Sequence, residues 1–376
     1  MGIHNEATYS KYLPLEAEMR RRLWWSIVTF DNRICEMAGY KTTTLAPTWD
    51  CRIPLNANDF ELQPEMREPP AATNDRPTEM IFAVVCSEIA DFVRHSVFHL
   101  DFTNPFLKTV VDRPSPADEA ARLIALEKTL EERYLAFCDQ DNPLHFMTIW
   151  TMRSQLAKDQ LLQHYSRYTT ASTQQTDAQH SMAISHALRM LECDTNLVGS
   201  RLTKGYCWLV HFHFPFPAYV HLLQDLKKRP LMAHADWAWE AMSRNYQVRI
   251  KQVTQEDRHF FIIFSRIVLQ AWEARESLEA RRQERETTPS PPPIVYDIRE
   301  KMMQIRANFL AGGGDQTQSD DSGSGLPGFN MDEFSTLSTL MDFDVPGMAY
   351  GTGAQGDSAD MGPCGYPEIP GPTPMD

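Results

Sequence analysis

The sequence predicts an all-α fold, in which a body of many helices is followed by a disordered acidic C-terminal tail. Apolar residues recur at spacings of three and four through most of residues 14–310, which is the period of an amphipathic helix. No β-rich region and no repeat period is visible. Thirteen of the 17 glycines lie from Gly312 onward, together with seven prolines. Such a segment cannot bury enough apolar surface to offset the entropy of ordering it.

The first predicted helix covers residues 14–38. Pro14 suits its first position, and Gly39 is a plausible stop. The apolar residues of this helix form a single stripe of Met19, Leu23, Ile27, Phe30, Ile34 and Met37. A proline-rich segment over residues 41–77 follows, and we expect an ordered loop there.

The later helices carry clearer start signals. A helix fits residues 79–99, with Phe82, Val85, Ile89, Phe92 and Val93 inward. Ser115-Pro116-Ala117-Asp118 combines an N-cap, a first-turn proline and an acid, and it opens a helix that runs to about Cys138. We expect further helices at 143–168, 178–198, 206–226 (broken at Pro215 and Pro217), 234–252, 255–286 and 296–310.

These elements define a predicted organisation in three parts. Residues 1–286 form the helical body, residues 287–311 form a linker (TTPSPPP) and a short helix, and residues 312–376 form the disordered tail.

Charge and cysteine usage exclude several classes of function. The net charge is −14, and residues 307–376 hold eleven Asp and Glu with no Lys or Arg, so residues 1–306 carry only −3. Phosphate contacts need a concentrated basic face, so direct DNA binding by this chain is not expected. The seven cysteines form no CxxC pair, so we expect no cysteine-rich zinc site. No stretch approaches the ~18 apolar residues of a membrane span, so no membrane partner is expected.

Residue types suited to catalysis occur without the partners that catalysis needs. His95 and His99 stand at i and i+4, a spacing that can hold a metal, but the zinc-protease pattern needs a glutamate where Ser96 stands. Packed or surface histidines are the preferred interpretation, also for His211 and His213 among their aromatic neighbours. No nucleophile–base pair, P-loop or GxGxxG sequence is found, so we predict no catalytic or metal-binding residue and no enzyme.

The acidic tail contains a segment of distinctive composition at residues 329–344. Bulky apolar residues there alternate with acids and small polar residues, which is typical of an acidic activation segment that folds on a partner's groove. The alternatives are an inert tail, or a helix that docks back on the body. The apolar residues of this segment are Phe329, Met331, Phe334, Leu337, Leu340, Met341 and Phe343.

Residues 16–33 read Glu-Ala-Glu-Met-Arg-Arg-Arg-Leu-Trp-Trp-Ser-Ile-Val-Thr-Phe-Asp-Asn-Arg. This segment resembles the signature of the fungal-specific transcription factor domain, the multi-helix regulatory domain of fungal zinc-cluster transcription factors. The residues that carry the resemblance are Glu18, Arg20, Arg21, Arg22, Leu23, Trp24, Trp25 and Asp31. Residues 52–59 and 206–250 resemble later parts of the same domain.

The three arginines of this motif point in successive directions around the helix, so they cannot share one face. We expect at least one to pair with Glu18 or Asp31 and another to stack on a tryptophan. Trp24 and Trp25 should supply buried area at helix contacts. A packing role without a ligand is therefore the preferred interpretation of the motif.

The resemblance implies a regulator of transcription in the nucleus, with a fungal metabolic or secondary-metabolite gene cluster as its target. Transcriptional co-activators are the expected partners, along with a DNA-binding regulator or a second copy of the chain. The family's six-cysteine zinc cluster, its expected cofactor site, is absent from these residues, which indicates a truncated sequence or a stand-alone variant. The alternatives are an accessory or dominant-negative factor without DNA binding, and a helical small-molecule-binding protein or enzyme.

Overall fold

The computed structural model describes residues 2–38, 49–70, 76–96, 115–169, 175–249, 258–282 and 290–311. Within these ranges the regular structure is helical and no β-strand occurs, which confirms the all-α class. The predicted tail, residues 312–376, lies outside the described residues, and the segment 329–344 lies outside with it. The α-helices of the described residues are α1 (Pro14–Ala38), α2 (Ile81–Arg94), α4 (Pro116–Arg133), α5 (Pro143–Thr169), α6 (Asp177–Gly199), α7 (Cys207–Phe212), α8 (Phe216–Lys228), α9 (Ala235–Arg249), α10 (Arg258–Arg282) and α11 (Pro293–Ala311).

The predicted start and stop signals act as expected at two places. The Ser115 hydroxyl accepts a hydrogen bond from the backbone N–H of Asp118 at 3.1 Å and caps α4. The predicted break near residue 215 separates α7 from α8, because Pro215 is the N-cap of α8 and Pro217 stands in its first turn. One 3-10 helix, Glu6–Lys11, precedes α1 and has no counterpart among the predicted elements.

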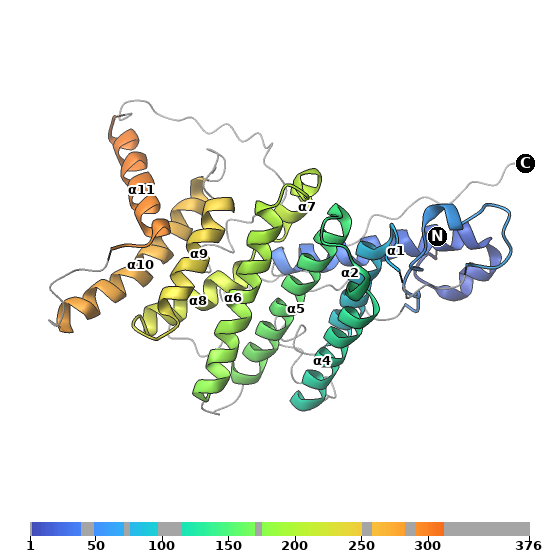
Figure 1. The fold of residues 1–376 in the computed structure, drawn as a ribbon, viewed down its shortest axis with the longest axis horizontal. Helices are drawn as coiled ribbons and strands as arrows, with labels where there is room; N and C mark the ends of the chain where they lie inside the picture. Colours follow the sequence, from blue (N-terminus) through green and yellow to red (C-terminus); the bar gives the residue numbers. More distant parts are fainter. Residues whose placement is uncertain are drawn as a thin grey trace, which may run out of the picture.

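The helix α1 runs in a different direction from its neighbours. In Figure 1, α4, α5 and α6 run side by side, and α1 lies at a steep angle to them. Contacts join α4 to α5, α5 to α6, and α1 to α2. The segment from Trp49 to Leu62, between α1 and α2, folds against α1 and is tied to it by the hydrogen bonds described below.

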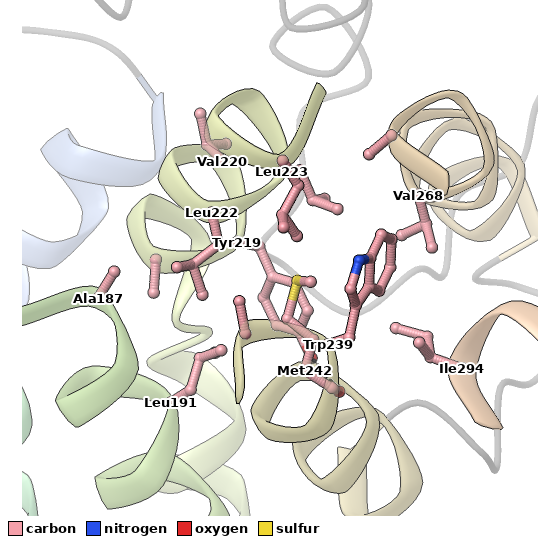
Figure 2. Close-up of a cluster of buried hydrophobic side chains, with 14 of the residues drawn as sticks. Ala187, Leu191, Tyr219, Val220, Leu222, Leu223, Trp239, Met242, Val268 and Ile294 are labelled. Carbon is pink, nitrogen blue, oxygen red and sulfur yellow. Dashed lines mark hydrogen bonds between the residues drawn. The ribbon is translucent and has the colours of Figure 1, made fainter. Parts of the chain in front are cut away.

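Two apolar clusters fill the body, and α5 contributes to both. Figure 2 shows the larger one, where side chains of α6, α8, α9, α10 and α11 converge around Tyr219, Trp239 and Ile294. The second cluster joins α2, α4 and α5 through residues such as Val85, Leu130 and Leu156. A smaller third cluster surrounds Trp25 of α1.

A buried ion pair connects the helices of the larger cluster. Arg249 at the end of α9 lies 2.5 Å from Asp194 of α6, and both side chains are only 3% exposed. Arg249 also donates to the carbonyl of Val210 in α7 at 2.9 Å. Asn245 donates to Asp194 at 2.7 Å and accepts from the Tyr219 hydroxyl at 2.8 Å. Four helices, α6 to α9, are therefore joined by one satisfied polar network.

Candidate functional site

The candidate site is α1, whose two faces differ in chemistry. On the inward face, the Glu18 carboxylate is fully buried and accepts a hydrogen bond from the Leu55 N–H at 2.9 Å. Arg21 and Arg22 each approach this carboxylate to 3.5 Å. Burial raises the pKa of Glu18, while the Leu55 N–H and the two guanidinium groups oppose that rise. The expected pairing of a motif arginine with Glu18 is present.

The same arginines reach residues on both sides of α1 in the sequence. Arg21 pairs with Glu6 of the N-terminal 3-10 helix, and Arg52 also binds Glu6, at 2.7 Å. Burial alone would raise the pKa of Glu6, but the hydrogen bonds from Arg21 and Arg52 bring it below its ordinary value. Arg22 pairs with Asp59 at 2.6 Å. The motif thus fastens the segments before and after α1 onto the helix.

The arginines stack on tyrosines, so the expectation that one would stack on a tryptophan is wrong. Arg20 lies 4.0 Å above the Tyr12 ring, and Arg21 lies 5.0 Å above the Tyr9 ring. The tyrosines belong to the N-terminal segment, whose position relative to α1 could not be inferred from the spacing of residues within the helix.

The two tryptophans of the motif are buried, as predicted, and pack on a third tryptophan. Trp24 and Trp25 meet Trp49 edge-on, with ring centroids 5.3 and 5.2 Å apart. Arg94 of α2 covers Trp49 at 3.6 Å. The Trp25 indole N–H donates to the carbonyl of Arg52 at 2.8 Å. Sequence reasoning did not single out Trp49, Arg94 or Glu6, because each is distant from the motif in the chain.

The two remaining motif residues, Asp31 and Leu23, lie outside this network. Burial raises the pKa of Asp31, and its Oδ2 has no hydrogen-bond partner among the described residues. Leu23 is exposed. The structure therefore unites Glu18, Arg21, Arg22, Trp24 and Trp25 at one site, and it places Arg20 at the border of that site, where it binds Glu16 at 2.9 Å.

The outward face of α1 carries an exposed apolar stripe. We call Met19, Leu23, Ile27, Phe30 and Ile34 the outer stripe; these residues are 41% to 53% exposed. An amphipathic helix normally turns its apolar stripe to the core. In α1 the inward positions are taken by Glu18, Arg21, Trp25 and Val28, so the stripe found from the sequence period faces solvent.

The outer stripe continues onto α7. The rings of Phe30 and Phe212 are stacked, with centroids 5.0 Å apart. Trp208 precedes Phe212 by one helical turn, so it shares that face of α7, and it is 67% exposed. The Arg33 side chain donates to the Phe212 carbonyl at 2.9 Å, which fixes α7 against α1.

A second polar cluster surrounds Asp225 of α8. Its carboxylate binds His180 at 2.7 Å, His234 at 2.5 Å and Arg229 at 2.7 Å. Burial would raise the pKa of Asp225, but these partners bring it below its ordinary value. The neighbouring His221 bonds the Tyr165 hydroxyl at 2.6 Å, and burial lowers the pKa of His221 to about 3.

His213, among its aromatic neighbours, is a packed residue. Burial lowers the pKa of His213 to about 3, and its Nδ1 contacts the Gln155 amide at 3.2 Å. His99 lies outside the described residues, so the pair with His95 is not tested. Over the ranges that the structure describes, no group of three or more His, Cys, Asp or Glu is arranged to hold a metal, and no helix is long and apolar enough to cross a membrane.

A cavity of about 270 Å³ lies between α9, α10 and the start of α11, with Trp239 and Trp272 in its wall. Ligand pockets usually measure about 300–1,000 Å³. The charged groups at its edge are already engaged, since Arg275 binds Asp236 at 2.6 Å. The exposed surface of α1 is therefore the stronger candidate for function.

Comparison with known families agrees with the motif on α1. Residues 1–171 match the family described as the fungal specific transcription factor domain. This range contains the whole motif and ends just after α5. The resemblance predicted from the motif is confirmed over residues 1–171, and the predicted later part at residues 206–250 lies outside this match.

Several curated proteins are similar to most of the chain. "Transcriptional regulator AacuB" of Aspergillus aculeatus is 60% identical over 99% of this chain and 50% of its own length. "Transcriptional regulator nsrM" of Aspergillus novofumigatus is 44% identical over 100% of this chain and 50% of its own length. "Aurofusarin cluster transcription factor aurR2" of Gibberella zeae is 26% identical over 87% of this chain and 48% of its own length. The chain thus spans about half the length of these relatives, and no solved structure matches it.

Proposed function

We propose that this chain regulates transcription of a fungal secondary-metabolite gene cluster, acting in the nucleus and without enzymatic activity. The observation that carries the proposal is the similarity of nearly the whole chain to proteins named as transcriptional regulators. One further relative is named as a regulator of the aurofusarin cluster, which supports a biosynthetic cluster as the target.

The proposed mechanism uses protein contacts. Arg20, Arg21 and Arg22 each hold a carboxylate of the chain itself, so they offer little free charge to DNA phosphates. The outer stripe is an apolar surface of the kind that marks protein interaction sites. In this proposal the helical body binds protein partners or an effector, and the apolar residues of 329–344 recruit co-activators.

A reporter assay tests the activation step. Residues 312–376 are fused to a heterologous DNA-binding domain, and we expect expression of the reporter. Phe334→Ala and Phe343→Ala should each lower that expression, because an activation segment binds its partner through bulky apolar side chains.

Tyr366→Ala, an aromatic substitution in the same tail but outside 329–344, is the matched control and should leave expression unchanged. A silent fusion, or an equal loss with Tyr366→Ala, rules out activation by this segment. Sequence-specific DNA binding by the purified chain would contradict the expectation that this chain does not bind DNA directly.

A further inference from the structure

We propose that the outer stripe of α1 is the docking surface for residues 329–344 of the same chain, which lie outside the described residues. The surface is defined by the side chains of Met19, Leu23, Ile27, Phe30 and Ile34, all between 41% and 53% exposed. Apolar groups left in water on one continuous face favour a partner that covers them.

The occupant should be an amphipathic helix of about the same length as the stripe. Met19 to Ile34 spans about 23 Å at 1.5 Å per residue. Residues Phe329 to Phe343 would span about 21 Å as a helix, with Phe334, Leu337 and Met341 at spacings of three and four on one side. Helix-on-helix contact at this spacing is an established mode of recognition.

The area of the stripe favours an intramolecular occupant over a second copy. A stable interface between two proteins takes about 800 Å² from each partner. Five half-exposed apolar side chains form a patch on the order of a few hundred Å². A segment of the same chain needs less area, because the covalent link raises its effective concentration at the surface.

The charges at the border are compatible with an acidic occupant. Arg22, Arg20 and Arg33 stand three residues from Met19, Leu23 and Phe30 respectively, so each adjoins the stripe. Residues 329–344 contain Asp332, Glu333, Asp342 and Asp344 and no Lys or Arg. Arg20, Arg22 and Arg33 already bind Glu16, Asp59 and Glu36, respectively, so an acid of the docked segment would be the second carboxylate on a guanidinium that has five N–H donors. Because Glu16 and Asp31 lie on the same border, the apolar match contributes more than the charge.

This docking rests on the proposed function and adds a form of regulation to it. The docked residues 329–344 would be hidden from the co-activators that they are proposed to recruit. Docking itself can be measured without transcription. A photoreactive benzoylphenylalanine is placed at Leu23 of the full chain, the purified protein is irradiated, and the cross-linked peptides are identified by mass spectrometry.

We expect cross-links within one molecule from Leu23 to residues 329–344. The same probe at Met182 of α6, which is similarly exposed at 58%, should give several-fold fewer of them. The double variant Phe334→Ala, Leu337→Ala should reduce the Leu23 cross-link several-fold, and as a change in the tail it leaves the packed body intact.

Three outcomes overturn the proposal: cross-links from Leu23 mainly to a second molecule, cross-links mainly to other parts of the chain, and a Leu23 cross-link that the double variant does not reduce. A silent reporter fusion together with the expected cross-link would reject activation and leave docking supported. The two failures are therefore distinguishable.

Discussion

The buried Glu18 carboxylate stabilises the fold mainly through its packing and its hydrogen bond, and less through its charge. It accepts from the Leu55 N–H, and its raised pKa means that keeping it ionised in the folded protein costs free energy. Its neighbours Arg21 and Arg22 retain carboxylate partners in Glu6 and Asp59 without it.

We therefore expect Glu18→Ala to lower the free energy of unfolding by about 2 kcal/mol, because it leaves a buried N–H without an acceptor. Glu18→Gln, which keeps an acceptor oxygen, should cost clearly less. Urea denaturation measures both, with Glu16→Ala as the exposed control. Equal losses for Ala and Gln would mean that the ion pairs dominate instead.

At the scale of the helix, α1 is inverted relative to the usual amphipathic pattern. Trp25 is 2% exposed while Leu23 is 53% exposed. Trp25→Ala should cost about 3–5 kcal/mol of unfolding free energy through loss of buried contacts. With residues 312–376 removed, so that the tail cannot dock on the stripe, Leu23→Ser should change it by about 0.5 kcal/mol or less, as for most surface substitutions. Thermal or urea unfolding compares them, and a large loss for Leu23→Ser would show that the stripe is covered by the folded body.

The sequence predicted the elements well because their signals are local. The cap at Ser115 and the prolines near 215 act within a few residues, so helix starts and breaks followed from the chain itself. The orientation of α1 depends on distant partners: Leu55 is 37 residues from Glu18, and Arg94 reaches Trp49 from another helix. Periodicity identifies a stripe of residues, but only such contacts decide which way it faces.

At the scale of the whole molecule, buried histidines make stability depend on pH. Burial lowers the pKa of His213 and His221 from 6.5 to about 3, and that of His164 to about 4. The unfolded chain therefore binds these protons more tightly. The stability that they contribute is complete above pH 6.5 and is lost as the pH falls below it.

We expect the urea midpoint to fall between pH 7 and pH 5, with each such histidine contributing up to about 1.4 kcal/mol per pH unit below 6.5. The pKa values of Asp225 and Glu6 are lowered in the folded protein. Their contribution to stability is therefore lost only below their ordinary pKa values of 3.8 and 4.5, which lie outside the range from pH 7 to pH 5. His221→Gln should make the decline shallower. A decline that His221→Gln leaves unchanged would show that His221 is not buried in the folded protein.

The helix α5 belongs to both large clusters at once. Met152 and Leu156 pack with α2 and α4, while Ala157 and Leu161 pack with α6 and α8. The family match ends at residue 171, between α5 and α6, two helices that lie against each other. A chain cut there would keep every residue of the family match, yet it would expose to water the side of α5 that packs against α6 and α8. The boundary of the family match therefore lies inside a folding unit.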